Sequence, residues 1–225
     1  MSQPLSSDTP WSQVHTLLLP AYGETVLMVG IVMVLVVLLG TVMGVLLFNT
    51  SEQGLFPRPR LQRALGWVIN MGRSLPFLVL MAAIIPFTKY ITGTTIGIKA
   101  AVVPMVIAGV PFFARLVENA LRELPRHSNA VGLVSCGSVP QIIWRVQLHE
   151  ALPSLIAGVT LNTISMIEYS AIAGTIGAGG LGYLAVVYGY QRFDHHIMVA
   201  TIVVLVLTIQ GVQWLGDWLV RRSSH

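Results

Sequence analysis

The sequence predicts an all-α integral membrane protein with five transmembrane helices. Of its 225 residues, 54% are hydrophobic and only 10% are charged, which is far from the composition of soluble domains. Two uncharged blocks, Thr25–Phe48 and Ile197–Gly216, are long enough to cross a bilayer, since the 24 residues of the first reach about 36 Å at roughly 1.5 Å each. The single cysteine, Cys136, excludes an intrachain disulfide and a cysteine cluster for a metal.

Between these blocks the chain is interrupted by prolines, glycines and single charges, and three further spans fit there. Each proline removes a backbone hydrogen bond, which is tolerated at membrane depth where protein or a water-lined cavity accepts the freed carbonyl. Together the prolines favour irregular helices around a pathway, although a kinked packing helix explains any single one. They are Pro76, Pro86, Pro104, Pro111 and Pro153. We expect a single transmembrane domain over residues 1–225, with spans near 25–48, 64–87, 100–117, 151–174 and 197–216 and a long loop over 118–150.

The distribution of arginine and lysine orients these spans. Basic residues accumulate on the cytoplasmic side of short loops, and here they gather in the first loop, the third loop and the tail. This predicts an N-terminus outside, a C-terminus inside and a cytoplasmic loop 118–150. The same residues form no continuous stripe, so the net charge of +4 does not predict a nucleic-acid partner.

The stretch "GAGGLG", residues 177–182, matches the G-x-G-x-x-G pattern of dinucleotide-binding folds. That pattern binds a nucleotide only within a βαβ unit, whereas here it follows a predicted membrane helix and faces the outer compartment. We therefore interpret the glycines as a sharp turn that packs against neighbouring helices.

No catalytic motif is present. The sequence contains no G-x-x-x-x-G-K-[ST], no H-E-x-x-H and no G-x-S-x-G, so we expect neither a P-loop nor an enzyme active site. His195 and His196 stand beside Asp194 in the fourth loop, where a solvated loop is favoured over a metal site.

Glu168 is a carboxylate within the fourth predicted span, roughly 25 Å along a helix that begins at Ala151. Two interpretations stay open: it meets the ammonium of a zwitterionic solute in a hydrated cavity, or it pairs at the interface with Lys89 or Lys99. Arg73 lies about six residues into the second span from its cytoplasmic side, which is roughly 9 Å. We interpret it as an anchor at that interface.

The third loop carries an apolar face in "NAVGLVSCGSVPQIIWRV", which predicts a short helix followed by an interfacial helix. Such a face either packs under the membrane domain or docks into a groove of a cytoplasmic partner.

With spans and loop placed, the sequence resembles the permease subunit of bacterial methionine ABC importers, from about Gly23 to Arg222. The matching stretches are "GETVLMV", "RSLPFLVLMAAIIPFT", "GTTIGIKAAVVP", "PFFARLVENAL", "EALP", "EYSAIAGTIGAGGLG" and "YGYQRFD". The resemblance implies a homodimer in the bacterial inner (plasma) membrane, two cytoplasmic ATPase subunits that bind the ATP and Mg, and a substrate-binding protein outside. It implies no catalytic residue, metal or cofactor on this chain.

The resemblance also implies that the third loop holds a helix that docks into the ATPase and transmits its closure. The corresponding residues are Val131, Gly132, Val134, Ser135, Cys136, Gly137 and Ser138. This loop departs from the family because no acidic residue lies between Glu123 and Glu150, and because His149 replaces the proline that usually precedes "EALP".

We expect alternating access, with the gate on the fourth span. The closed gate is expected to be lined by Met166, Tyr169, Ser170 and Ile172, with Asn162 deeper in the pathway and Glu168 beside it. The alternatives are ordinary packing for Met166 and Ile172 and an interfacial ring for Tyr169. Glu168 departs from the small residue that is usual before "YSA" in the family.

The expected function is therefore ATP-driven uptake of methionine or of a close relative such as its D-enantiomer. The alternatives are a permease for another amino acid or small organic cation, a self-sufficient secondary transporter, and a scaffold without transport. Secondary transporters usually show internal repeats, and we find none in five spans.

Overall fold

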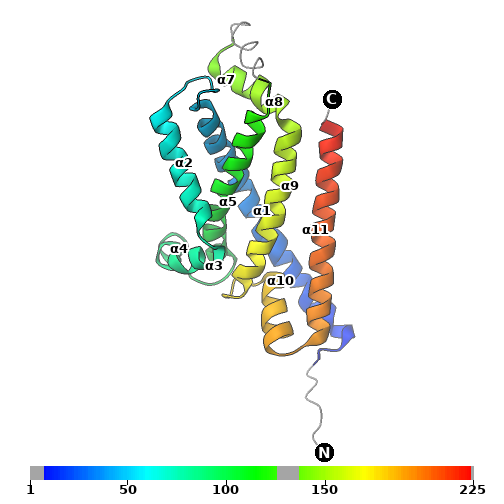
Figure 1. Ribbon diagram of the computed structural model, residues 1–225. Coiled ribbons are helices and arrows are strands. Elements are labelled where there is room, and N and C mark those ends of the chain that lie inside the picture. The colour runs from blue at the N-terminus through cyan, green and yellow to red at the C-terminus, as the bar shows by residue number, and fades with distance from the viewer. Residues whose placement is uncertain (1–7, 126–136, 224–225) are drawn as a thin grey trace, which may run out of the picture. The chain divides into compact units, whose positions relative to one another are not determined.

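The computed structural model describes residues 8–125 and 137–223, and every regular element within them is a helix (Figure 1). The predicted all-α class is therefore confirmed for this part of the chain. The elements are α1 (Trp11–Asn49), α2 (Pro59–Ser74), α3 (Phe77–Ala83), α4 (Ile85–Thr92), α5 (Ile98–Arg122), α7 (Val139–Ile142), the π-helix η1 (Ile143–Gln147), α8 (Leu148–Glu150), α9 (Leu152–Gly174), α10 (Gly180–Tyr183), the π-helix η2 (Leu184–Gln191) and α11 (His195–Ser223).

Four of the described helices, α1, α5, α9 and α11, are long and apolar enough to cross a membrane. A fifth span is reached when α2 and α3 are taken together as one broken span. Helix α1 begins at Trp11, well before the expected Thr25, and continues through Pro20.

The span expected over 64–87 is not one continuous helix in the structure. Helix α2 ends at Ser74, Leu75 is extended with ψ 132°, and Pro76 precedes α3. The cause is steric, because a proline ring disfavours the helical conformation of the residue before it. A second break at Ile84 starts α4, where Pro86 occupies the first turn and needs no amide.

The chain divides into two compact units, and each long helix contributes to both. Unit 1 contains Met1–Met33, Pro76–Val106 and Thr163–Val212. Unit 2 contains Val34–Leu75, Ile107–Asn162 and Gln213–His225.

The core of unit 1 joins the start of α1 to α10, η2 and α11. Val14 and Ala21 pack against Leu181, Leu184 and Ile197, all of which are buried. This packing places the N-terminal part of α1 against the segment that follows the glycine stretch.

Asp194, expected in a solvated loop, is instead 3% exposed and caps the start of α11. Its Oδ1 accepts from the Ile197 amide at 3.0 Å, and its Oδ2 accepts from the Thr9 hydroxyl at 2.6 Å. Burial raises the pKa of the Asp194 carboxyl, but the hydrogen bonds from Thr9 and Ile197, together with nearby His196, outweigh burial and hold the pKa below its ordinary value. The fourth loop is therefore ordered by a buried cap that also holds the chain at Thr9.

Unit 2 is built on close helix contacts. A Cβ at Gly44 would lie 2.5 Å from the carbonyl oxygen of Ala114, so α1 and α5 approach closely there. Around this contact Leu47, Ile69 and Ala114 form a buried core.

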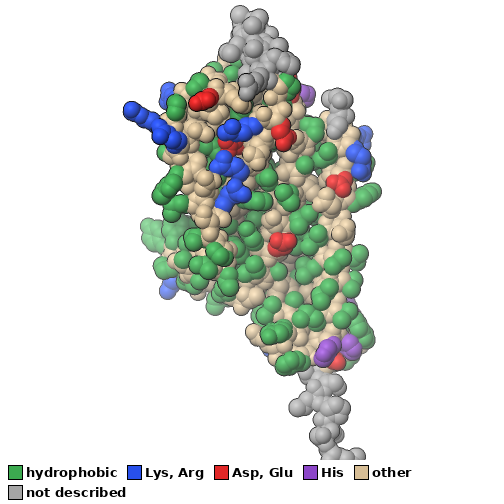
Figure 2. All heavy atoms as spheres, viewed as in Figure 1, with side chains coloured by type: hydrophobic (Ala, Val, Ile, Leu, Met, Phe, Trp, Pro, Cys, Tyr) green, Lys and Arg blue, Asp and Glu red, His purple; other side chains and the backbone are tan. Residues whose placement is uncertain are grey.

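Apolar side chains are also exposed on the outside of the helices, and Figure 2 shows them gathered along α11. Val199, Ile202, Val203, Val206 and Leu207 are each at least half exposed. A surface of this kind is typical of a helix that faces lipid.

Candidate functional site

The glycine stretch forms a sharp, packed turn between α9 and α10. Gly177, Gly179 and Gly180 have φ of +91°, +86° and +78°, a region that favours glycine. The Gly180 amide donates to Glu24 Oε2 at 2.7 Å, and the Leu181 amide donates to Thr25 Oγ1 at 2.9 Å. Side chains of α1 thus accept hydrogen bonds from the first amides of α10. A dinucleotide-binding fold would use such amides to bind a pyrophosphate.

The same turn is fixed to two further elements of unit 1. The Gly97 amide donates to the Gly177 carbonyl at 3.0 Å, just before α5. A Cβ at Gly182 would overlap the backbone of Ala171 in α9. The last turns of α9 are therefore held in place by α1, by the chain before α5 and by the turn itself.

The six residues expected along the pathway do not share one environment. Met166 and Asn162 are fully buried and Ser170 is 2% exposed, with its hydroxyl donating to the Ile167 carbonyl at 2.7 Å. Tyr169 and Ile172 are half-buried, and Glu168 is exposed. Burial within this chain places Met166, Ser170 and Asn162 in the interior of their units.

Tyr169 stacks on Phe77, with ring centroids 4.4 Å apart and an interplanar angle of 3°. Phe77 is the first residue of α3, directly after the break at Pro76. Sequence reasoning missed Phe77, although it stands in the quoted stretch "RSLPF". The break presents this ring to α9.

Glu168 lies on an open, partly polar face of α9. Ser165, Glu168, Ile172 and Thr175 follow one another at helical spacings of three and four residues, and each is exposed or half-exposed. One interpretation of Glu168 was an ion pair with Lys89 or Lys99, and no such pair occurs in the described part of the chain. A carboxylate on the open face of an apolar helix indicates a water-filled pathway or an interface rather than lipid.

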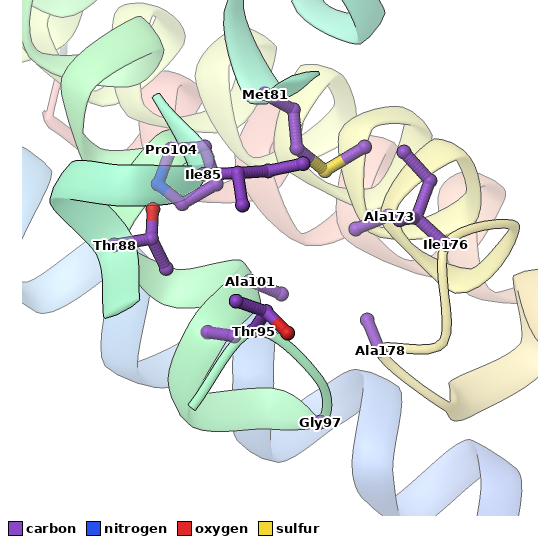
Figure 3. A pocket seen from close by; sticks show the side chains of 11 residues that line it. Met81, Ile85, Thr88, Thr95, Gly97, Ala101, Pro104, Ala173, Ile176 and Ala178 are labelled. Atoms are coloured by element: carbon purple, nitrogen blue, oxygen red, sulfur yellow. The ribbon is translucent and has the colours of Figure 1, made fainter. Parts of the chain in front are cut away.

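Unit 1 also holds a small, partly open apolar cavity of about 30 Å³ (Figure 3). Met81 and Ile85 approach it from one side, while Ala173 at the end of α9 and Ile176 just after that helix approach it from another. A volume of this size suits a water molecule and is far too small for an amino acid. None of the six expected pathway residues lines this cavity.

The residues expected to contact an ATPase lie largely outside the described part of the chain. Val131, Gly132, Val134, Ser135 and Cys136 fall within residues 126–136, and only Gly137 and Ser138 are described. The Ser138 amide donates to Gln141 Oε1 at 2.9 Å and so helps to begin α7. Residues 137–150, which we call the connecting segment, run through α7, η1 and α8 and lead into α9.

A buried pair of side-chain amides joins the connecting segment to the end of α1. Asn49 Nδ2 donates to Gln147 Oε1 at 2.8 Å, and Gln147 Nε2 donates back to Asn49 Oδ1 at 2.9 Å. Both residues are 0% exposed. Sequence reasoning missed this pair, because a lone Gln within "RVQLHE" and an Asn at the end of an apolar block carry no distinguishing pattern.

Helix α5 continues past Val117, where its span was expected to end. Glu118 is 0% exposed and pairs with Arg115 and Arg122, and its Oε1 lies 2.7 Å from Arg122 Nη2. Arg115 Nη2 also donates to Asn70 Oδ1 of α2 at 2.9 Å. The two cations provide the partners that a buried carboxylate requires. Across residues 8–125 and 137–223 no group of three or more His, Cys, Asp or Glu is arranged to hold a metal ion.

Comparisons with known proteins agree with one another. The family model of the binding-protein-dependent transport system inner membrane component matches residues 37–225. A probable D-methionine transport system permease protein, MetI, of Vibrio cholerae is 49% identical over 214 residues, which cover 93% of each chain. The methionine import system permease protein MetP of Bacillus subtilis is 38% identical over 76% of this chain and 78% of its own length.

Among solved structures, one described as inward-facing conformations of the MetNI methionine ABC transporter superposes with a TM-score of 0.92 at 35% identity and covers 100% of both chains. Together with the family match over more than half of the sequence, this likeness leads to one assignment. The chain belongs to the family of binding-protein-dependent transport system inner membrane components.

Proposed function

We propose that this chain is the permease subunit of an ATP-driven ABC importer that takes up methionine by alternating access. The observation that carries the proposal is the likeness over the whole chain to the permease of a methionine ABC transporter, with 49% identity to a probable D-methionine permease. The chain itself would catalyse no reaction. ATP and Mg would bind to the partner ATPase.

The assembly we propose is a homodimer of this chain in the bacterial inner membrane, with two ATPase subunits on the cytoplasmic side and a substrate-binding protein outside. Arginines gather around the start of α2, at Arg58, Arg60 and Arg63, and at the end of α11, at Arg221 and Arg222. This grouping supports an N-terminus outside and a C-terminus inside. The seven residues of the third loop that the resemblance assigns to ATPase coupling would then face the ATPase.

On this proposal the open face of α9 lines the pathway. Glu168, Tyr169 and Ile172 would contact passing solute, while Met166, Ser170 and Asn162, which are buried, would support α9 from behind. The stacking of Tyr169 on Phe77 would make the break after Pro76 part of the gate.

Reconstitution tests the function. The permease, its ATPase and its binding protein are placed in proteoliposomes, and uptake of labelled L- and D-methionine is followed with and without ATP. We expect uptake only when ATP and all three components are present. Robust ATP hydrolysis without methionine uptake would rule out methionine as the transported solute. Uptake without the ATPase would rule out an ATP-driven importer.

Cys136 tests the topology, because it is the sole cysteine and lies in the loop proposed to be cytoplasmic. A membrane-impermeant thiol reagent should label inside-out vesicles and leave right-side-out vesicles unlabelled. The reverse pattern would invert the orientation.

A second candidate is a permease for another amino acid or small organic cation, and the exposed carboxylate of Glu168 favours it. A carboxylate on the pathway attracts an ammonium group, whereas a small side chain does not. Uptake competition with unlabelled amino acids, for the natural chain and for Glu168→Ala, separates the two. A change of solute preference in Glu168→Ala supports the role of Glu168, and an unchanged preference excludes it.

A further inference from the structure

Asn49 at the end of α1 and Gln147 in the connecting segment join these two elements through hydrogen bonds between their side chains. The Asn49 amide makes four hydrogen bonds: Nδ2 donates to the Val45 carbonyl at 3.0 Å and to Gln147, while Oδ1 accepts from the Leu55 amide at 3.2 Å and from Gln147. Four is the full capacity of a side-chain amide. Its plane is therefore fixed from both sides and cannot turn without breaking a buried hydrogen bond.

The backbone on the α1 side of this pair is fixed as well. The Phe56 amide donates to the Asn49 carbonyl at 3.1 Å, and the Arg58 amide donates to the Thr50 carbonyl at 2.9 Å. Gly54 packs directly on the backbone of Asn49, where a Cβ would overlap it. The loop after α1 thus wraps around the helix end and leaves Asn49 little freedom to move separately from α1.

On the other side, Gln147 is the last residue of the π-helix η1. π-Helical turns are rare and occur frequently at functional sites. Gln147 itself is buried, although its neighbours Arg145 and His149 are exposed. The π-helix η1 therefore ends at the residue, Gln147, whose polar side chain reaches inward to α1.

We propose that the Asn49–Gln147 pair is the joint that makes α1 move with the connecting segment during transport. This inference rests on the proposed function, in which the ATPase displaces the chain just before α7. A purely apolar contact permits sliding between equivalent positions, whereas a reciprocal buried amide pair is satisfied in one register only. Asn49 and Gln147 are positioning residues, since they act on the pathway through α1.

The test uses the complete reconstituted complex and measures methionine uptake and ATP hydrolysis on the same proteoliposomes, together with thermal stability. The variants are Asn49→Leu, Gln147→Leu and the double variant N49L/Q147L. Asn119→Leu is the matched control, because Asn119 is an exposed asparagine in the same unit. The exchanged variant N49Q/Q147N keeps two amides at the joint.

Each single variant removes the two hydrogen bonds that join the amides and should lower stability. The double variant removes both polar side chains and should recover part of the loss, since the Leu55 amide still lacks its acceptor. Uptake per ATP hydrolysed should nevertheless stay at least about fivefold below the control in the double variant, which is the low end of typical coupling between sites. The exchanged variant should couple better than the double variant.

A double variant that regains both stability and the control ratio of uptake to hydrolysis would overturn the proposal, since the pair would then serve stability alone. Should the double variant fail to assemble, the exchanged variant decides. If N49Q/Q147N assembles and its ratio of uptake to ATP hydrolysis equals that of Asn119→Leu, the proposal is supported. If it assembles and this ratio falls, the proposal is overturned. Failure of the proposed function is recognised separately, because the natural chain and Asn119→Leu would then take up no methionine.

Discussion

Units 1 and 2 both attach α1 to the chain that flanks α9, but they do so by different chemistry. In unit 1 a carboxylate and a hydroxyl, Glu24 and Thr25, accept from backbone amides of a glycine turn. In unit 2 two neutral side-chain amides, Asn49 and Gln147, pair with each other. Glu24 is exposed, whereas both amides are fully buried.

This difference determines what each attachment requires. The unit 1 attachment depends on backbone geometry, because only glycine accommodates the turn and its close approach to α9. The unit 2 attachment depends on exclusion of water, because water could replace a lost partner at Glu24 but not at Asn49. The turn is therefore most sensitive to added volume, and the amide joint is most sensitive to a missing partner.

The largest effect is expected from volume added to the turn. In Gly182→Ala the new methyl group would overlap the backbone of Ala171, which cannot move aside as a side chain does. We expect a loss of roughly 3 kcal/mol or more in unfolding free energy, at the upper end of overpacking costs. The measurement is thermal unfolding and monodisperse yield in detergent.

Gly211→Ala is the control for this substitution, because a Cβ at Gly211 meets no atom within 4 Å. It should be neutral or slightly stabilising through higher helix propensity. Equal stability of Gly182→Ala and Gly211→Ala would show that the turn tolerates an added methyl group. The proposed difference between the attachments in units 1 and 2 would then be wrong.

A missing partner in unit 2 is expected to have the next largest effect. Asn49→Ala removes two hydrogen bonds from the buried Gln147 amide and one from the Leu55 amide. We expect a cost of about 2 kcal/mol in denaturant-induced unfolding, typical of buried groups that lose a partner. Asn119→Ala, at an exposed site, should change stability by less than about 0.5 kcal/mol; a cost at Asn49 no larger than this would contradict the role of burial.

The corresponding change in unit 1 should be smaller. Glu24→Ala removes the acceptor for the Gly180 amide, but water can take its place, so we expect a cost of about 1 kcal/mol, as for a lost helix cap. Glu24→Gln keeps an acceptor oxygen and should recover most of this loss. A cost at Glu24 larger than that at Asn49, measured in the same unfolding assay, would reverse the comparison.

The smallest effect is expected from the pH dependence of the Asp194 cap in unit 1. The pKa of Asp194 is lowered in the folded chain, so its contribution to stability is complete above the ordinary pKa of aspartate and disappears as the pH falls below about 4. Natural chain and Asp194→Asn should therefore differ in melting temperature at neutral pH and converge in acid. A difference in melting temperature that persists unchanged below pH 4 would contradict the role of the Asp194 carboxylate.

Much of the fold was predictable because lipid imposes strict requirements on sequence. The blocks 25–48 and 197–216 lie inside α1 and α11, since a span must be long, apolar and helical to satisfy its backbone. The prolines marked the second span as irregular, but only the structure located its breaks at Leu75–Pro76 and Ile84. In the fourth loop the residues Asp194, His195 and His196 looked solvated, because the partner of Asp194, Thr9, is 185 residues away.

The sequence by itself determined the helical class, the membrane location of the long apolar blocks and the presence of a tight turn at "GAGGLG", because length, polarity and missing Cβ atoms act locally. Only the tertiary structure decided which polar groups meet: Glu24 with the turn, Asn49 with Gln147, and Tyr169 with Phe77. These contacts join residues far apart in the chain. For the Asn49–Gln147 pair the stabilisation also depends on the exclusion of water, which no local pattern of residues records.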